Sequence, residues 1–339
     1  MASLDQRRYE VHNLSTKKVF ALFVILGWTL LIVADRVDEL RVYQGATIAI
    51  MTLAIASIII LTGYSGQVSL GHGAFLAIGA YAAALSQTYW KSPFWFTLLM
   101  SVLVTSLIGF ILGFAAARLS GPYLAGTTLA LAVGLPTLAN QFEFLGGETG
   151  LVYDAGNPPA RFGETFTLYK WFFWISALVV LIAMFLIRNL LHSRYGRTWK
   201  ALRANPTAAQ LCGINVPQSK ILAFTISAGA AGLSGALLGM ISIVAPSAFP
   251  LSLSFTLITG AVLAGVTSLA GSILGAVILV VIPEIAEVIA KSLGESEKIT
   301  SNLPGFIVSV LLIITVLFSP NGPAESLRKR RVHHQKAKH

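Results

Sequence analysis

Long apolar runs separated by short polar stretches dominate the chain. Ten runs approach the roughly 20 residues that a helix needs to cross a bilayer. These runs are 19–34, 45–62, 74–90, 94–117, 123–139, 171–187, 221–244, 253–267, 271–290 and 305–319. The pattern predicts an all-α polytopic membrane protein with about ten transmembrane helices. The eighth and ninth runs are the least secure, because only a short Thr/Ser/Gly break separates them.

Composition supports a membrane protein. Of 339 residues, 55% are apolar and 11% are charged, whereas a soluble domain carries about 25% charged residues. A soluble globular protein is therefore excluded, and the high hydrophobicity excludes a disordered chain. The single cysteine, Cys212, allows neither an internal disulfide nor a thiolate metal site.

The positions of the charges predict the orientation. Ten spans place both termini on one side, and the segments assigned to that side are 1–18, 63–73, Arg118, 188–220, 268–270 and 320–339. They hold all but seven of the 24 Lys and Arg residues, the exceptions being Arg36, Arg41, Lys91, Arg161, Lys170, Lys291 and Lys298. Basic residues gather in cytoplasmic loops, so both termini are expected in the cytoplasm. The net charge of +10 is then a topology signal, and no nucleic-acid partner is predicted.

The first run has a second interpretation. Arg7, Arg8, Lys17 and Lys18 precede it, as basic residues precede a secretory signal. However, the run ends in Ile-Val-Ala at 32–34, which is a poor cleavage site. We therefore expect an uncleaved membrane anchor.

Ionisable groups are almost absent from the predicted spans. Glu284 and Glu287, beside Pro283, are the only acids within them. They could form an ion-coupling site, but a position near the outer end of the span, within reach of water, is favoured. The sequence also lacks the motifs G-x-x-x-x-G-K-[ST], H-E-x-x-H and G-x-S-x-G. No enzyme activity, ATP site, metal or cofactor is predicted, so energy must come from a gradient or from a partner.

Glycines four residues apart recur within the runs. This spacing lets helix backbones approach closely and predicts a compact bundle, as in channels, transporters and membrane enzymes alike. The pairs are Gly109 and Gly113, Gly235 and Gly239, and Gly271 and Gly275.

A glycine-rich segment, residues 63–73, interrupts the apolar pattern with the sequence GYSGQVSLGHG. Irregular backbone at membrane depth is tolerated only where it is buried in protein or lines a wet cavity, and broken segments mark transport paths. A plain cytoplasmic turn with capping serines explains the residues equally well. By itself, His72 is more often a packing histidine than a ligand.

A second informative stretch, residues 188–220, is called here the basic loop. Arg197, Lys200 and Arg203 are three residues apart and predict one basic helical face, with Trp199 and Leu202 on another side. This spacing suits a surface linker that follows the charge rule, and it also suits a docking element for a cytoplasmic partner.

The middle of the basic loop predicts a short helix. Asn205 and Pro206 are suited to its N-cap and first position, and Gly213 to its C-terminal end. The three-and-four spacing places Ala208, Leu211 and Cys212 on one small apolar face, with Ala209 beside it.

Both stretches resemble the M-type permease subunit of branched-chain amino-acid ABC importers. The motifs are GYSGQVSLGHGAF-x₃-GAY at 63–81 and GRTWKALRANPTAAQLCGINVPQSKILAF at 196–224. The pattern A-A-x-x-x-G at 208–213 matches the core of the family's coupling loop, and the resemblance extends over about 45–323. Two departures stand out: R-A-N-P at 203–206 lacks the acids of the usual Arg-Glu-Asn-Glu-like run, and 264–267 lacks a Gly-Gly pair.

The resemblance implies an ABC importer permease bundle with a broken Gly-rich segment, in the bacterial inner membrane. Its parts are a cytoplasmic N-terminal segment at 1–18, a transmembrane permease domain at 19–319 that includes the basic loop as coupling loop, and a basic cytoplasmic tail at 320–339. Implied partners are a second permease subunit, two cytoplasmic ATPase subunits, an extracytoplasmic solute-binding protein and the lipid bilayer.

The residue patterns and the resemblance together predict sites. The translocation path is expected at Gln67, Ser69 and His72, with Gly66, Gly71 and Gly73 setting the backbone. ATPase coupling is expected at Arg197, Lys200, Arg203, Ala208, Ala209, Leu211, Cys212 and Gly213. The acidic loop 140–170 is expected outside, where it helps to receive the binding protein. Branched-chain amino acids are the favoured substrates, urea or short amides are the alternative, and a gradient-driven carrier acting alone is a further one.

Overall fold

The computed structural model describes residues 16–119, 121–159, 162, 166–292, 303, 305–307, 309–310, 313–314 and 317. Over these ranges the chain is helical, with an isolated antiparallel bridge between Leu151 and Val244. The α-helices are α1 (Thr16–Asp35), α2 (Glu39–Ile58), α3 (His72–Trp90), α4 (Phe94–Arg118), α5 (Pro122–Gln141), α6 (Leu168–His192), α7 (Arg194–Ala204), α8 (Pro206–Leu211), α9 (Val216–Ile241), α10 (Leu251–Ala264) and α11 (Gly271–Ser292). A π-helix, η2 (Ile59–Tyr64), continues α2, and 3-10 turns form η3 (Glu143–Leu145) and η5 (Pro246–Ala248).

The described residues confirm an all-α membrane protein. Six helical stretches among them are long and apolar enough to cross a bilayer: Glu39–Tyr64, Phe94–Arg118, Pro122–Gln141, Leu168–His192, Val216–Ile241 and Pro246–Ala264. Two further apolar helices, Phe23–Ile32 and Gly271–Ala286, are shorter. The predicted run 305–319 lies largely outside the described residues. The structure thus supports the membrane class but not the count of ten spans, which stays a prediction.

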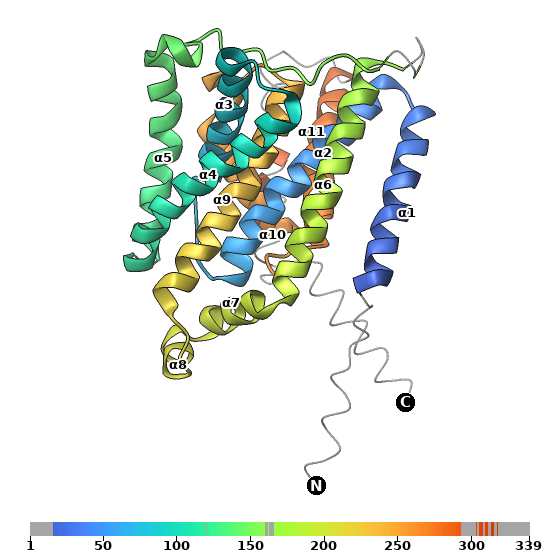
Figure 1. Ribbon diagram of the computed structural model, residues 1–339. Helices are drawn as coiled ribbons and strands as arrows, with labels where there is room; N and C mark the ends of the chain where they lie inside the picture. Colours follow the sequence, from blue (N-terminus) through green and yellow to red (C-terminus); the bar gives the residue numbers. More distant parts are fainter. Residues whose placement is uncertain are drawn as a thin grey trace, which may run out of the picture.

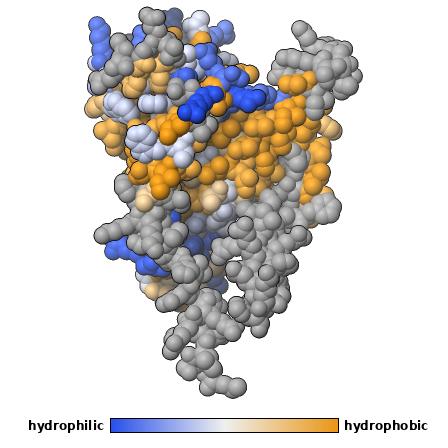
Figure 2. Space-filling model, turned by 90° about the vertical axis from the view of Figure 1, so that its right-hand side faces the viewer, coloured by the Kyte–Doolittle hydropathy of each residue, from blue (hydrophilic) through white to orange (hydrophobic). Residues whose placement is uncertain are grey.

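The helices stand side by side with the basic loop at one end of the bundle (Figure 1). α7 and α8 lie at the lower end of this view, while the connection from α5 toward α6 runs along the upper end. Figure 2 shows a broad hydrophobic area across the middle of one face, with hydrophilic residues gathered above it. Such a band is what a lipid-facing surface requires.

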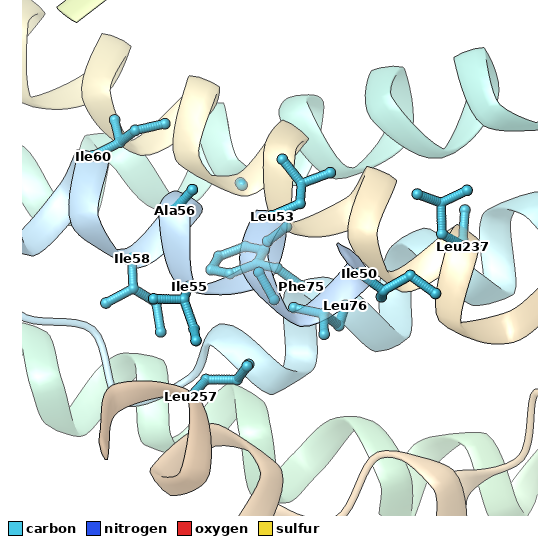
Figure 3. Close-up of a cluster of buried hydrophobic side chains, with 14 of the residues drawn as sticks. Ile50, Leu53, Ile55, Ala56, Ile58, Ile60, Phe75, Leu76, Leu237 and Leu257 are labelled. Carbon is cyan, nitrogen blue, oxygen red and sulfur yellow. The ribbon is translucent and has the colours of Figure 1, made fainter. Parts of the chain in front are cut away.

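α2 lies at the centre because it is apolar on every side, and a helix of that kind is stable only when surrounded. Buried residues account for 67% of its most apolar stretch, including η2, against 22% in α5. Figure 3 shows its side chains packed against α3, α9 and α10. The cluster includes Ile50, Leu53, Ile55, Ala56, Ile58, Ile60, Phe75, Leu76, Leu237 and Leu257.

Glycines bring the helix backbones into contact, as the four-residue spacing predicted. A Cβ atom on Gly235 of α9 would lie 1.9 Å from the Leu76 carbonyl oxygen of α3. On Gly79 of α3 it would lie 2.1 Å from the Gly232 carbonyl oxygen. Gly271 and Gly275 likewise face the carbonyl oxygens of Ala264 and Gly260, whereas a Cβ atom on Gly109 or Gly239 would meet a side chain, of Ala228 or Val244.

Candidate functional site

The Gly-rich segment is irregular backbone enclosed by the bundle. η2 ends at Tyr64, Gly66 adopts a positive φ of 74°, and helix resumes at His72. Gln67, Ser69 and His72 are 4%, 1% and 0% exposed. The predicted side chains are therefore packed inside the protein, which fits a bracing role better than a turn in free solvent.

Two glycines let neighbouring helices press onto this segment. A Cβ atom on Gly71 would lie 2.0 Å from the Thr128 carbonyl oxygen of α5. One on Gly73 would lie 2.6 Å from the Ser254 hydroxyl oxygen of α10. The same partners satisfy freed backbone groups, since Thr128 Oγ1 accepts from the Leu70 amide at 3.0 Å and Ser254 Oγ accepts from the Gly73 amide at 3.0 Å. Side chains from α5 and α10 thus replace the helical hydrogen bonds that the break removes.

His72 joins three parts of the fold through a buried chain of hydrogen bonds. The Ser227 hydroxyl of α9 donates to the Ser57 carbonyl of α2 at 2.6 Å. Ser227 must then accept from His72 Nε2 at 2.9 Å, which leaves Nδ1 to accept from the Ser69 hydroxyl at 3.0 Å. This assignment makes the imidazole neutral with both nitrogens bonded. His72 is a structural bridge between the segment, α2 and α9.

Gln67 retains an unsatisfied group. Its side-chain amide donates to Ser65 Oγ at 2.6 Å and to the Lys220 carbonyl at 3.2 Å. Its Oε1 is buried, and within the part of the chain that the structure describes it has no hydrogen-bond partner. A buried acceptor without a partner is costly. Among the predicted path residues, Gln67 is the one whose polar atom is open to a further contact.

The basic loop has the helix boundaries that its sequence predicts. Ser193 accepts from the Tyr195 amide at 3.2 Å and caps α7. Asn205 Oδ1 accepts from the Ala208 amide at 3.0 Å and caps α8. Gly213 follows α8 with a φ of 82°, a conformation that glycine adopts without strain.

α7 has the apolar side that its sequence predicts. Trp199 and Leu202 on this side are buried, with 0% and 2% of their surfaces exposed. Trp199 Nε1 also donates to the Ser219 carbonyl at 3.0 Å, tying α7 to the first turn of α9. On α8, Leu211 is 85% exposed, and Ala208 and Cys212 are exposed beside it. Ala209 is 4% exposed, so it packs within this chain and is not part of the open face.

The three basic residues have different surroundings. Arg197 donates to the His192 carbonyl at 3.3 Å, just before its own helix. Lys200 Nζ lies 5.1 Å from the centre of the Tyr64 ring, and Arg203 Nη1 donates to the Gly63 carbonyl. Lys200 and Arg203 therefore contact the Gly-rich segment, a relation that their three-residue spacing could not indicate.

Sequence reasoning missed the small polar residues that hold the segment. Thr128, Ser227 and Ser254 each lie in an apolar helix, and their hydroxyl groups bond to the segment or to His72. A hydroxyl within an apolar run is the available signal. It is weak, because such hydroxyls usually bond a carbonyl of their own helix, as Thr52 does with Ile48.

Glu284 is half-buried, and the side-chain amide of Gln44 donates to its Oε1. Gln44 lies in the second turn of α2. The predicted position of the acids near the outer end of the span, within reach of water, stays a prediction. The structure describes no surroundings for the Glu287 side chain. Within the described ranges, no three His, Cys, Asp or Glu side chains are grouped to hold a metal ion.

The predicted outer loop is anchored to the upper end of the bundle. Tyr153 is buried, shares a 2.6 Å hydrogen bond with Thr97 and stacks on Phe94. Burial raises the pKa of the Tyr153 phenol, while the Thr97 hydrogen bond acts in the opposite direction. Gln87 exchanges two hydrogen bonds with the Asp154 backbone, at 2.6 and 2.9 Å. The loop thus presents a fixed surface at the end opposite to α7 and α8.

The His72 bridge makes a direct prediction about stability. His72→Ala should leave the Ser69 and Ser227 hydroxyls without this partner, at a cost of about 1–3 kcal/mol for each buried polar group left unmatched. The thermal unfolding midpoint of the purified chain in detergent should fall. His192→Ala is the matched control, because His192 is exposed and bonds a carbonyl one turn earlier in its own helix. Equal midpoints for the two variants would show that His72 does not brace the fold.

Comparison with known proteins now adds to this geometry. Residues 42–316 match a family described as "Branched-chain amino acid transport system / permease component". The chain is 32% identical over 294 residues to the high-affinity branched-chain amino acid transport system permease protein LivM of Salmonella typhimurium, covering 79% of this chain and 67% of that protein. For LivM of Escherichia coli K12 the identity is 33% over 270 residues, covering 70% and 63%.

A second permease protein of the same named system is more distantly similar. LivH of Escherichia coli K12 is 28% identical over 162 residues, covering 48% of this chain and 49% of that protein. The chain spans about two thirds of the length of the two LivM proteins. Solved structures give no significant match. The family match over most of the chain and the LivM similarity place this protein in the branched-chain amino acid ABC transport permease family, among permeases of the LivM type.

Proposed function

We propose that this chain is the LivM-type membrane subunit of an importer that carries branched-chain amino acids into the bacterial cell. The observation that carries the proposal is the family match over residues 42–316. Since the sequence has no phosphate-binding loop, ATP is hydrolysed by partner subunits. Urea or short amides are the alternative cargo, and transport by this chain alone is the competing mechanism.

The proposed assembly contains a second permease, two cytoplasmic ATPase subunits and an external binding protein. In Escherichia coli K12 the names LivM and LivH denote two permease proteins of a high-affinity branched-chain amino acid system, and both resemble this chain. That pairing supports a second permease here. The absence of charged residues from the middle of the predicted spans supports an external energy source over ion coupling.

This assembly has a decisive test. Purification of the tagged chain in mild detergent should recover two ATPases and a second permease. Proteoliposomes with the recovered complex and its binding protein should take up leucine, isoleucine and valine only when ATP is supplied inside. ATP-dependent uptake of urea or acetamide that excess leucine does not inhibit would show that the substrates are urea or short amides instead. ATP-independent uptake by the chain alone would overturn the importer proposal.

The proposed topology has ten spans with both termini in the cytoplasm. The excess of Lys and Arg in the corresponding segments supports it. It places α7 and α8 inside the cell and the loop anchored by Tyr153 outside, where the loop receives the binding protein. Val152, 78% exposed beside Tyr153, belongs to the surface offered to that partner.

The Gly-rich segment is proposed to brace the translocation path. Its support is the irregular backbone held by α5 and α10, together with the unsatisfied Oε1 of Gln67. Val68 is 44% exposed, whereas its neighbours Gln67 and Ser69 are buried. A probe attached at position 68 is therefore sensitive to any group that packs against the segment. Movement of this segment between transport states is expected to change the accessibility of Val68.

One cysteine-labelling experiment tests both the orientation and the path. In a Cys212→Ser parent, Val152→Cys should react with a membrane-impermeant maleimide in intact cells. Val68→Cys should react at rates that differ between the resting complex and the complex trapped with vanadate. Reaction at position 152 only after lysis would invert the topology. An unchanging rate at position 68 would remove the segment from the path.

The open face of α8 is proposed to dock on an ATPase subunit. Leu211 dominates this face, with Ala208 and Cys212 beside it. Burying a leucine side chain is worth about 1.5–3 kcal/mol, so this contact guides and transmits motion but cannot hold the complex alone. Ala209 packs inward and is better left unchanged in a test of docking.

Leu211→Glu should therefore weaken coupling without affecting membrane insertion. Replacing the buried contact with a charge should lower ATP-dependent uptake about tenfold or more, since each 1.4 kcal/mol changes an equilibrium tenfold. Gln210→Glu adds the same charge to the opposite, exposed side of α8 and should retain uptake. Uptake and ATPase activity at wild-type levels in Leu211→Glu would show that α8 is only a linker.

A further inference from the structure

The basic loop and the Gly-rich segment are far apart in sequence but meet at the C-terminal end of η2. Figure 1 shows α7 beneath the lower end of α2, which η2 continues. Arg203 of α7 donates to the Gly63 carbonyl, and Lys200 lies over the Tyr64 ring. Two cations thus stand at the point where the apolar helix ends and the irregular backbone begins.

This end of the helix needs cations for two reasons. Carbonyl groups in the last turn lack amide partners from a following turn, and the helix dipole places partial negative charge there. Gly63 is buried, and a Cβ atom on it would lie 1.8 Å from the Val266 carbonyl oxygen in the α10–α11 connection. The guanidinium of Arg203 therefore reaches a carbonyl that is closed in by another part of the bundle.

The contact continues along the backbone. Gly66 has a φ of 74°, and a Cβ atom there would lie 3.1 Å from Arg203 Cγ and 3.4 Å from Arg203 Cα. Gln67 bonds to the Lys220 carbonyl, one residue beyond the Ser219 carbonyl that holds Trp199. α7, the start of α9 and the Gly-rich segment are consequently fixed to one another at several points.

We propose that Arg203 is a positioning residue that locks the Gly-rich segment to the basic loop. Displacement of α8 by an ATPase is then passed through α7 and Arg203 to Gly63, and through His72 to α2 and α9. This assignment gives Arg203 a role within the chain, in place of direct contact with the ATPase, because its guanidinium donates to the Gly63 carbonyl. The transmission step rests on the proposed importer function, whereas the lock does not.

The lock is tested on the purified full chain by amide hydrogen exchange. Arg203→Ala should speed exchange at residues 64–71 about tenfold, the effect of losing one hydrogen bond to a charged group. Arg203→Lys should restore part of the protection. Arg194→Ala removes a positive charge from the same helix, where the guanidinium lies 4.9 Å from the Tyr195 ring, and should leave exchange at 64–71 unchanged. Equal exchange rates in Arg203→Ala and the wild type would overturn the lock. This result needs no partner protein, because the experiment uses the purified chain alone.

The transmission is tested in the assembled complex, as molecules of leucine taken up per ATP hydrolysed. Arg203→Ala should lower this ratio about tenfold while ATP hydrolysis continues, as expected for loss of a bond of about 1.4 kcal/mol. Arg194→Ala should keep the wild-type ratio. A parallel fall of uptake and hydrolysis, with the ratio unchanged, would overturn the positioning role. A wild-type complex without ATP-dependent uptake would instead refute the proposed function, and the exchange experiment would still decide the lock.

Discussion

The structure depends on satisfying backbone polar groups where the apolar helix α2–η2 breaks. These groups are buried, and a buried backbone polar group without a hydrogen-bond partner is costly, so other parts of the protein must supply the partners. Here Thr128 and Ser254 accept from amides of the Gly-rich segment, and Arg203 donates to a carbonyl at its start. These partners come from three different parts of the chain. The break therefore obliges distant helices to gather around it, and this gathering forms the centre of the bundle.

The same requirement links membrane and loop regions of an importer subunit. A break held only by neighbouring spans would have no contact with the basic loop. Because one of its partners is an arginine on α7, the break is in contact with the loop that carries α8. His72 extends this contact to α9 and α2, because its Nε2 bonds to the Ser227 hydroxyl, which in turn donates to the Ser57 carbonyl. The hydrogen bonds that the break requires thus connect α7, the Gly-rich segment, α2 and α9.

Local features were predictable from the sequence, and long-range ones were not. The caps of α8 at Asn205 and Gly213 depend on residues within one or two turns, so the sequence predicted them correctly. Ser227, which bonds to His72, and Gly63, which bonds to Arg203, lie 155 and 140 residues away from them, and no spacing rule reaches that far. The apolar runs likewise predicted the membrane class. The number of spans depends on short helices and on residues outside the described ranges.

The backbone contacts of the glycines have a genetic consequence. At Gly63, Gly71, Gly79 and Gly235 a Cβ atom would lie between 1.8 and 2.1 Å from a carbonyl oxygen of another part of the chain. Every amino acid other than glycine carries that atom, and a backbone carbonyl cannot rotate away as the end of a side chain can. Any missense change at these four codons must therefore displace a helix or a turn, so inherited variation should accumulate instead on the outward faces of α4 and α5.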